Sequence, residues 1–450
     1  MSAVRLLAAT GGLGFTPPDP SRSYLRALER RPDAIVADAG SADIGPFFLG
    51  ADAVYNEPEW ERLDLERLLD GAARLDVPLI VGSCAGTGTD RGVEAYAQMV
   101  DELARARGRS FRTALIFAQQ ESSWLEQIVA DGRPARALTP LLGELSPAAV
   151  AASDTVVAVM GAQPIRAALG EGAQVVLAGR ACDDGLFAAA AQLHGADRAA
   201  GYLAGKLLEN ASLVAEPFVL RESVIGELVD GSVIVEPMLP EQRCTRASVA
   251  AQLMYERATP FKQAGPGGEL DLSQIQIEEL DDRRVVLSGA RYRELPPALK
   301  VEGAGCVGQR SLCIVGCRDP RMIAALDPIL DEVRTAVSSE GAKVSLKVYG
   351  RDAVMGDLEQ APGGVHEVGI VAETVAPTQT EANRACVLAK RLLFSAKYPL
   401  QKQTGGSVLS TIDEVVECGP AYRWTVNHVV SVRDVVEPFR TEMRTLGAGA

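Results

Sequence analysis

The feature that most constrains this chain is residues 78–107, where an apolar run passes through a glycine-rich turn into an amphipathic helix. The run 78–81 has the composition of a buried strand, and Gly82, Gly86 and Gly88 mark the turn. Apolar residues then recur at helical spacing on one face: Val93, Tyr96, Ala97, Val100, Leu103 and Ala104. Strand, turn and helix in this order form the unit with which open α/β folds build sites at the carboxyl ends of their strands.

The turn is a candidate anion site. Small residues let backbone N–H groups point outward, and the following helix N-terminus adds partial positive charge, which suits a carboxylate or a phosphate. The residues that would contact such an anion are Ser83, Gly86, Thr87 and Gly88. A tight connection without a ligand is the alternative. No lysine follows the glycines, so the turn is not a Walker loop.

Length and charge narrow the class of protein. A chain of 450 residues predicts two or three domains. A net charge of −14 without a basic block makes nucleic acid and anionic membranes poor partners. No run approaches the roughly 20 apolar residues of a spanning helix, and the N-terminus lacks the pattern of a signal peptide. Eight cysteines form no dense framework, so we expect a cytoplasmic protein.

Strand-like runs alternate with helical patterns up to about residue 211, which predicts an N-terminal α/β domain with a mostly parallel, doubly wound sheet. After the first strand, Gly11 and Gly12 could cradle a ligand. Pro17 and Pro18, however, interrupt the helix that a dinucleotide-binding fingerprint requires.

Charged residues follow two of the predicted strands. Asp38 and Asp43 come after one strand, and Arg180 and Asp183 come after another. Such positions hold acid/base groups or metal ligands in α/β enzymes, and an arginine there can clamp a carboxylate. The alternatives are an Asx-turn network around the first pair and an Arg–Asp pair that braces the second turn.

The rest of the chain changes pattern twice. Residues 212–308 suggest a mixed connecting region of short antiparallel strands, packed on the first domain. Residues 309–450 have the order βαββαβ, which is typical of a ferredoxin-like α+β domain. In that domain Asp319 with Pro320, and Thr378 with Glu381, form helix N-terminal signals.

Cys84 allows two interpretations. It could be a nucleophile, because a thiol near a helix N-terminus can have a lowered pKa. Alternatively, it is simply a small residue that fits the turn. Three histidines are too few for a multi-histidine metal site, so no metal ligands are predicted. The sequence leaves open whether a divalent ion such as Mg²⁺ binds at Asp38 and Asp43.

Several long strings resemble the acyclic terpene utilisation family, the AtuA-like proteins. They are DAGSADIGPFFLGA (38–51), the turn 79–91, VVLAGRACDDGLFAAA (175–190), VEPMLPEQRCTRASVAAQLMYE (235–256), LKVEGAG (299–305), KVYGRDAVMG (347–356), HEVGIVAETVAPTQ (366–379) and GPAYRWTVNHVV (419–430). The resemblance implies an N-terminal α/β domain followed by a ferredoxin-like domain. It also implies a cytoplasmic role in the catabolism of branched or carboxylated acyl compounds, with a small companion protein.

Two functions remain open. The first is an enzyme, a lyase (hydratase or dehydratase) or an isomerase, that acts on a carboxylate or an acyl-CoA without a required cofactor. Its catalytic candidates are Asp38, Asp43, Asp183, Arg180 and His366. Its further substrate-binding candidates are Lys300 and Arg351, which with His366 could contribute from a second domain. The second function is a non-catalytic metabolite-binding or scaffolding subunit. A homodimer is expected for a soluble enzyme.

Overall fold

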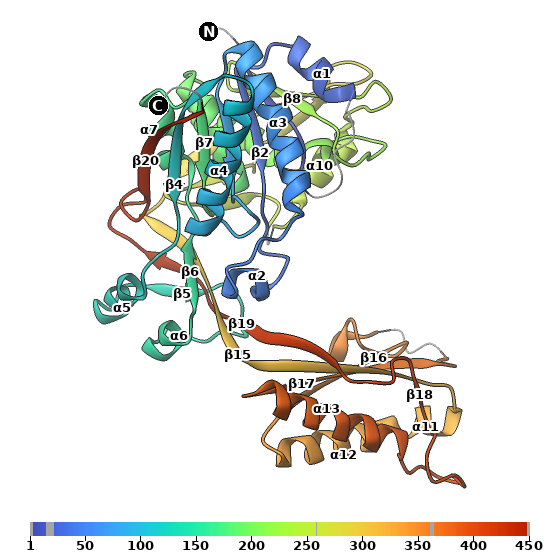
Figure 1. Cartoon of the computed structure of the whole chain (residues 1–450). Coiled ribbons are helices and arrows are strands. Elements are labelled where there is room, and N and C mark those ends of the chain that lie inside the picture. Colours follow the sequence, from blue (N-terminus) through green and yellow to red (C-terminus); the bar gives the residue numbers. More distant parts are fainter. Residues whose placement is uncertain (1–2, 15–21, 258, 361–363, 448–450) are drawn as a thin grey trace. The chain divides into compact units, whose positions relative to one another are not determined.

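The computed structural model describes residues 3–14, 22–257, 259–360 and 364–447 of a mixed α/β chain (Figure 1). The chain forms two compact units. The first consists of Met1–Gly305 with Trp424–Ala450, and the second is Cys306–Arg423. The sequence-based boundaries lay at 211/212 and 308/309. The units differ from these because strands after residue 211 extend the first sheet, and because the last strand of the chain rejoins that sheet.

The first unit is built on a ten-stranded sheet in the order β12-β13-β9-β8-β1-β2-β3-β7-β4-β20. Its middle strands pair in parallel: β1 (Val4–Ala8), β2 (Ala34–Asp38), β3 (Leu79–Gly82), β7 (Val175–Ala178) and β4 (Ser110–Phe117). The outer strands pair antiparallel: β8 (Val224–Val229), β9 (Ser232–Pro237), β12 (Gln276–Glu279), β13 (Val285–Ser288) and β20 (Arg440–Gly447). The sequence predicted the parallel strands and the antiparallel middle region.

Helices cover both faces of this sheet, which explains why its central strands β2, β3 and β7 are apolar apart from Asp38 at the end of β2. Every residue of β2, β3 and β7 is buried. One face packs against α1 (Arg22–Glu29), α3 (Pro58–Leu75) and α4 (Asp90–Ala106). The opposite face packs against α7 (Ala162–Gly170), α8 (Asp183–Leu193) and α9 (Arg198–Leu208).

The neighbouring strands β3 and β7 lead to opposite faces of the sheet. The chain leaves β3 for α4 on one face, and it leaves β7 for α8 on the other. Where connections diverge in this way, the carboxyl ends of the strands border a crevice that open α/β folds use for ligands. The loops after β3 and β7 are therefore the place to look for a site.

Smaller elements complete the first unit. They are α2 (Pro46–Gly50), α5 (Ser122–Ala130), β5 (Ala135–Ala137), α6 (Pro147–Ala151), β6 (Thr155–Ala158), the 3-10 helix η1 (Ala211–Val214), α10 (Arg246–Met254) and the sheet of β10 (Lys262–Gly265), β11 (Gly268–Asp271) and β14 (Arg291–Glu294). The strand β6 pairs with the first part of β15 (Ala298–Cys317).

In its described residues, the second unit contains three α-helices and a sheet with the strand order β16-β17-β15-β19. Its elements after β15 are α11 (Pro320–Ala324), α12 (Leu326–Ser339), β16 (Lys343–Tyr349), the 3-10 helix η2 (Gly356–Leu358), β17 (Val368–Ala376), α13 (Gln379–Phe394), β18 (Leu409–Ser410) and β19 (Val416–Ser431). Both predicted helix starts are confirmed, since Asp319 caps α11 and Thr378 with Glu381 forms a capping box on α13.

No helix in the described ranges combines the length and the apolarity that crossing a bilayer requires.

Candidate active site at the carboxyl ends of β2, β3 and β7

The loop after β3 has an unusual backbone. Ser83 and Ala85 have φ values of 48° and 60°, and Gly86 and Gly88 have φ values of 95° and 67°. Glycine adopts this left-handed region without strain, whereas the two other residues do so at a cost. At Gly88 a side chain is excluded for a second reason, because a Cβ atom there would lie 2.2 Å from the backbone nitrogen of Arg180.

The loop after β7 is held directly against this turn. The backbone N–H of Arg180 donates to Gly88 O (3.1 Å), and the N–H of Ser83 donates to Gly179 O (3.1 Å). The Ser83 hydroxyl oxygen accepts from Arg180 Nη1 (3.3 Å) and from the N–H of Ala181 (3.4 Å). Ser83 therefore orients the arginine side chain inside the crevice between β3 and β7.

Arg180 forms a buried ion pair with Glu302 of β15. Arg180 Nε donates to Glu302 Oε2 at 2.9 Å, and Lys300 Nζ lies 2.6 Å from Glu302 Oε1. Burial alone would raise the pKa of Glu302, but the charges of Arg180 and Lys300 lower it to about 2. Arg180 and Lys300 thus share the single negative charge of Glu302. Within the described residues Arg180 Nη2 has no hydrogen-bond partner, and 36% of the Lys300 side chain is exposed. The two cations can therefore bind a further anion.

Asp38, at the end of β2, is a buried carboxyl group. It is 8% exposed, its Oδ2 accepts from the N–H of Gly40 (3.1 Å), and its Oδ1 has no hydrogen-bond partner in the described part of the chain. Burial raises the pKa of Asp38 well above its usual range, the charge of Asp183 raises it further, and Arg180 opposes the shift. Asp38 therefore holds its proton more strongly than an ordinary aspartate does, as a general acid must.

A pocket of about 310 Å³ opens beside Asp38. The loops after β1 and β2 line it together with residues before α3: Gly11, Gly12, Leu13, Asp38, Ala39, Gly40, Ser41, Asp43, Ile44, Tyr55 and Asn56. No lysine or arginine is among these described lining residues. Tyr55 packs edge-to-face on Phe48, with ring centroids 5.1 Å apart. The pocket thus suits an uncharged, partly apolar portion of a ligand.

Asp183, the first residue of α8, is the second carboxyl group of the crevice. Burial raises its pKa, while the charges of Arg180, Lys206 and Lys300 lower it, and no hydrogen bond to its carboxyl group occurs within the described residues. The surroundings of the two carboxyl groups differ, because three cations lower the pKa of Asp183, whereas Arg180 opposes the raised pKa of Asp38. Two carboxyl groups in different environments divide into an acid and a base.

Further titratable groups lie behind Asp183. Burial raises the pKa of Asp184 to about 7, and its Oδ2 accepts from Gln263 Nε2 at 2.9 Å. Lys206 Nζ lies 2.6 Å from Glu209 Oε1, and burial raises the pKa of Glu209 to about 8 despite this lysine. The Lys206 ammonium also stands over the Tyr255 ring, 5.3 Å from its centroid. These groups extend the polar environment of Asp183.

The family model described as "Acyclic terpene utilisation family protein AtuA" matches residues 4–411 of the 450. The chain belongs to the AtuA family. The resemblance seen in the sequence is thereby confirmed, and the matched range contains each residue of the crevice described above. Comparison of this AtuA-family chain with curated proteins and with solved structures gives no significant match.

The AtuA-family fold brings together most of the residues that the sequence singled out. Asp38, Ser83, Gly88, Arg180, Asp183 and Lys300 share the crevice. Gly86 lies against the loop after β2, where a Cβ atom at Gly40 would be only 1.9 Å from Gly86 O. The two loops therefore meet at the crevice. Thr87 is buried beside these residues, and Asp43 is exposed at the pocket. The predicted Arg–Asp brace is wrong, since Arg180 pairs with Glu302 instead.

Two predicted residues belong to the second unit. Arg351 Nη1 donates to Asp327 Oδ1 (2.7 Å) and its Nε donates to Asp352 Oδ2 (3.0 Å), while His366 is exposed. Their part in a site stays a prediction. Pro17 and Pro18, which interrupt the predicted glycine fingerprint, lie outside the described residues.

Sequence reasoning missed Glu302, although a signal was present. Lys300 and Glu302 are the charged residues of an otherwise apolar run, and a spacing of two places them on one face of a strand. It also missed the buried pair Lys206 and Glu209, which lie one helical turn apart.

The structure favours the turn-residue interpretation of Cys84. Its thiol is fully buried, and its Sγ lies 3.9 Å from Val81 O. Burial raises the pKa of Cys84 well above its usual range, and the charges of Glu61 and Asp38 raise it further. A neutral, enclosed thiol is a poor nucleophile. Among the described residues, no group of three or more His, Cys, Asp or Glu side chains is arranged to hold a metal ion.

Proposed function

We propose that this AtuA-family protein is an acid–base enzyme that acts on a small carboxylate. The reaction is that of a lyase, which adds or removes water across a C=C bond, or of an isomerase, which shifts that bond. One observation carries the proposal: two carboxyl groups with different environments, the buried Asp38 and the partly exposed Asp183, flank Arg180 in a crevice at the strand ends.

In this proposal the substrate carboxylate binds at Arg180. The guanidinium offers Nη2, because its Nε and Nη1 are held by Glu302 and Ser83. Lys300 supplies a second positive charge to the same anion. Since both protein partners fix the orientation of Arg180, the substrate binds to a group that is already in place.

Asp183 is the base and Asp38 is the acid. In a dehydration, Asp183 takes a proton from carbon, the C–H electron pair forms the new C=C bond, and the hydroxyl group leaves as water with the proton of Asp38. Hydration is the reverse. In an isomerisation, Asp183 takes a proton from one carbon and Asp38 delivers one to another. The raised pKa of Asp38 supports this role, because burial favours its protonated form.

The pocket beside Asp38 supports a free acid more than its coenzyme A ester. The described residues that line it carry carboxylates but no cation, which suits the uncharged part of a substrate and not a nucleotide phosphate. We therefore propose a small, partly apolar carboxylic acid as the substrate, with the acyl-CoA as the alternative. In this proposal the side chain of Asp38 supplies the acid, because its raised pKa favours the protonated form, and no cofactor is required.

The remaining proposals concern the setting of the enzyme. We propose that the second unit is a ferredoxin-like domain, which its βαββαβ order and its strand order β16-β17-β15-β19 support. A homodimer, a small companion protein and a cytoplasmic location are proposed from the family resemblance and from the properties of soluble enzymes.

A non-catalytic subunit is the second candidate function. Its supporting observation lies in the second unit, where Val354, Met355 and Leu358 are 84%, 51% and 71% exposed in one short segment. Exposed apolar side chains that cluster in this way are typical of a surface that binds another protein.

A thermal-shift screen tests the proposal. The ligands are unsaturated and hydroxylated branched acids, short dicarboxylates and the coenzyme A esters of both, each with and without Mg²⁺. A ligand at one hundred times its Kd stabilises the native state by about 2.7 kcal/mol, which shifts the melting temperature measurably. The proposal expects a shift with free acids that Arg180→Gln abolishes. The control variant Arg293→Gln, which removes an exposed arginine paired with Glu269, should keep the shift. The absence of a shift with any of these acids contradicts it.

A further inference from the structure

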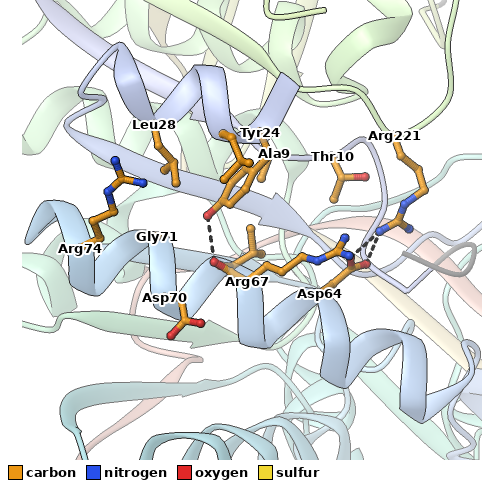
Figure 2. Close-up of a pocket in the computed structure, with 12 residues that line it drawn as sticks. Ala9, Thr10, Tyr24, Leu28, Asp64, Arg67, Asp70, Gly71, Arg74 and Arg221 are labelled. Atoms are coloured by element: carbon orange, nitrogen blue, oxygen red, sulfur yellow. Dashed lines mark hydrogen bonds and ion pairs between the residues drawn. The ribbon is translucent and has the colours of Figure 1, made fainter. Parts of the chain in front are cut away.

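The pockets of this protein differ in whether the charges around them are already paired. In the pocket of about 300 Å³ between α1 and α3 of the first unit, Arg221 donates to both oxygens of Asp64 (Figure 2). The Tyr24 hydroxyl in the same pocket donates to Arg67 O at 3.1 Å. The charge of Arg221 is thus matched by a protein carboxylate, and this pocket offers no free cation at that residue.

A larger pocket, of about 710 Å³, is lined only by residues of the second unit. It lies where β15 ends and β17 begins, and residues of the segment 398–411 complete it. It shares no lining residue with the pocket at Asp38. Its volume falls within the range of about 300 to 1,000 Å³ that is typical of small-molecule sites.

The floor of this larger pocket is bare backbone. Gly316 of β15 and Gly369 of β17 are directly paired. Their neighbours Cys317 and Val368 belong to the core under α12 and α13, so the two glycines lie on the opposite face of the sheet. A Cβ atom at either glycine would meet no atom closer than 3.9 Å, and neither glycine has a left-handed φ value. The fold itself therefore does not require glycine here, and the space above the two residues is free.

Apolar side chains border the two glycines. Tyr349 of β16 pairs with Gly369, and Leu409 of β18 pairs with Gly316, so the four residues form one row across the sheet. Tyr349 is 53% exposed and Leu409 is 76% exposed. Bare backbone between an aromatic and an aliphatic side chain forms a trough that suits an aromatic ring.

Two opposite charges lie at the end of this trough. Arg318 and Glu367 flank the last residue pair of the ladder between β15 and β17, and both line the pocket. Both are exposed, and neither has an ion-pair or side-chain hydrogen-bond partner among the residues that the structure describes. Asp319 differs from them, because it accepts from the Tyr398 hydroxyl at 3.0 Å and caps α11. A free cation beside a free anion matches the carboxylate and the ammonium of an amino acid.

We propose that the pocket at the ends of β15 and β17 binds a free amino acid with an aromatic side chain. The carboxylate of the ligand accepts from Arg318, its ammonium donates to Glu367, and its ring lies on the two glycines of the floor. Exposed ion pairs contribute little individually, so the affinity depends on both charges and the ring together. This inference does not depend on the proposed catalytic function.

Isothermal titration calorimetry with L-phenylalanine tests the proposal on the full chain. The compound 3-phenylpropionate has the ring and the carboxylate without the ammonium, and 2-phenylethylamine has the ring and the ammonium without the carboxylate. Each should bind at least about fivefold more weakly than L-phenylalanine, because each loses one of the two ionic contacts.

Charge substitutions locate the ionic contacts. Arg318→Gln and Glu367→Gln should each weaken the binding of L-phenylalanine about fivefold. The control is Arg384→Gln, which removes an exposed arginine of the same unit outside the pocket and should leave the affinity unchanged.

Gly369→Val tests the floor. Valine suits a strand, and its side chain would occupy free space, so the variant should keep the melting temperature of the parent protein and bind L-phenylalanine at least about tenfold more weakly. Arg180→Gln should keep the parent affinity. Unchanged affinity in Gly369→Val, equal affinity for 3-phenylpropionate, or no saturable binding by the parent protein would each overturn the proposal. Loss of binding in Arg180→Gln would overturn it as well, because it would place the amino acid in the crevice of the first unit.

Discussion

Arg180 and Glu302 lie 122 positions apart in the sequence and form a buried ion pair, with Arg180 Nε 2.9 Å from Glu302 Oε2. The pair joins the loop after β7 to the strand β15. Glu302 also holds Lys300, so a single carboxylate positions both cations of the candidate site. The two cations of the candidate site are therefore brought together only when β15 has paired with β6.

Removing the charge of Glu302 should destabilise the fold. Glu302→Gln leaves Arg180 buried without a counter-ion, and breaking a buried pair in this way costs about 3 to 5 kcal/mol. Urea unfolding at pH 7 measures the loss. The matched control is Glu294→Gln, since Glu294 also pairs with an arginine, Arg198, but is 79% exposed and should cost at most about 1 kcal/mol.

The cost of Glu302→Gln should also depend on pH. The pKa of Glu302 falls from 4.5 to about 2 on folding, so its ionised form stabilises the native state above pH 4.5. The difference between parent and variant should shrink as the pH falls from 4.5 towards 2. A difference that stays constant over this range would contradict the assigned ion pair.

Asp38→Asn should separate stability from catalysis. Folding raises the pKa of Asp38. The native protein therefore keeps a proton on Asp38 that the unfolded chain releases above about pH 3.8, so the stability of the native state falls as the pH rises past this value. Asparagine keeps the shape and releases no proton. The variant should equal the parent protein in stability below pH 3.8 and exceed it at pH 7, while any turnover is lost. A variant that is less stable than the parent at pH 7 would show that Asp38 is ionised.

Local signals explain which parts of this structure the sequence predicts. The caps at Asp319 and Thr378 involve residues within three positions of each other, so the sequence alone specifies them. Asp38, Ser83 and Arg180 were found because parallel strands place their carboxyl ends at one edge of a sheet. Neither inference requires knowledge of distant contacts.

Long-range pairing explains what the sequence does not predict. Glu302 belongs to the site because β15 pairs with β6, and no residue near Arg180 in sequence indicates this. The strand β20 was missed for a related reason. It lies at the edge of the ten-stranded sheet and carries charged residues such as Arg440, Glu442 and Arg444, which obscure the apolar pattern of a strand.

Gly88→Ala should cost more than Gly108→Ala. Both glycines are left-handed, with φ values of 67° and 59°, so each alanine adds about 1 to 2 kcal/mol of backbone strain. Only the Cβ atom at Gly88 meets another atom, the Arg180 nitrogen at 2.2 Å, whereas no atom lies within 4 Å at Gly108. Thermal unfolding of both variants compares their stabilities with that of the parent protein. Equal losses of stability would show that the loops after β3 and β7 are not in contact.

Cys84 should resist alkylation in the native protein. Its thiol is fully buried and its pKa is raised, whereas Cys306 is exposed. Iodoacetamide at pH 8, followed by peptide mass spectrometry, should label Cys306 first and reach Cys84 only after unfolding. Labelling of Cys84 at the rate of Cys306 would restore the nucleophile hypothesis.

Deuterium exchange into a bound acid tests the central claim most directly, because it detects proton transfer at carbon even when turnover is slow. The acids that stabilise the protein are incubated with it in D₂O and followed by NMR. The account predicts that the parent protein incorporates deuterium at a carbon near the carboxylate, and that Asp183→Asn lowers this rate at least about a hundredfold while it still binds the acid. Acids that bind but never exchange in the parent protein would contradict acid–base catalysis and leave the non-catalytic subunit as the function.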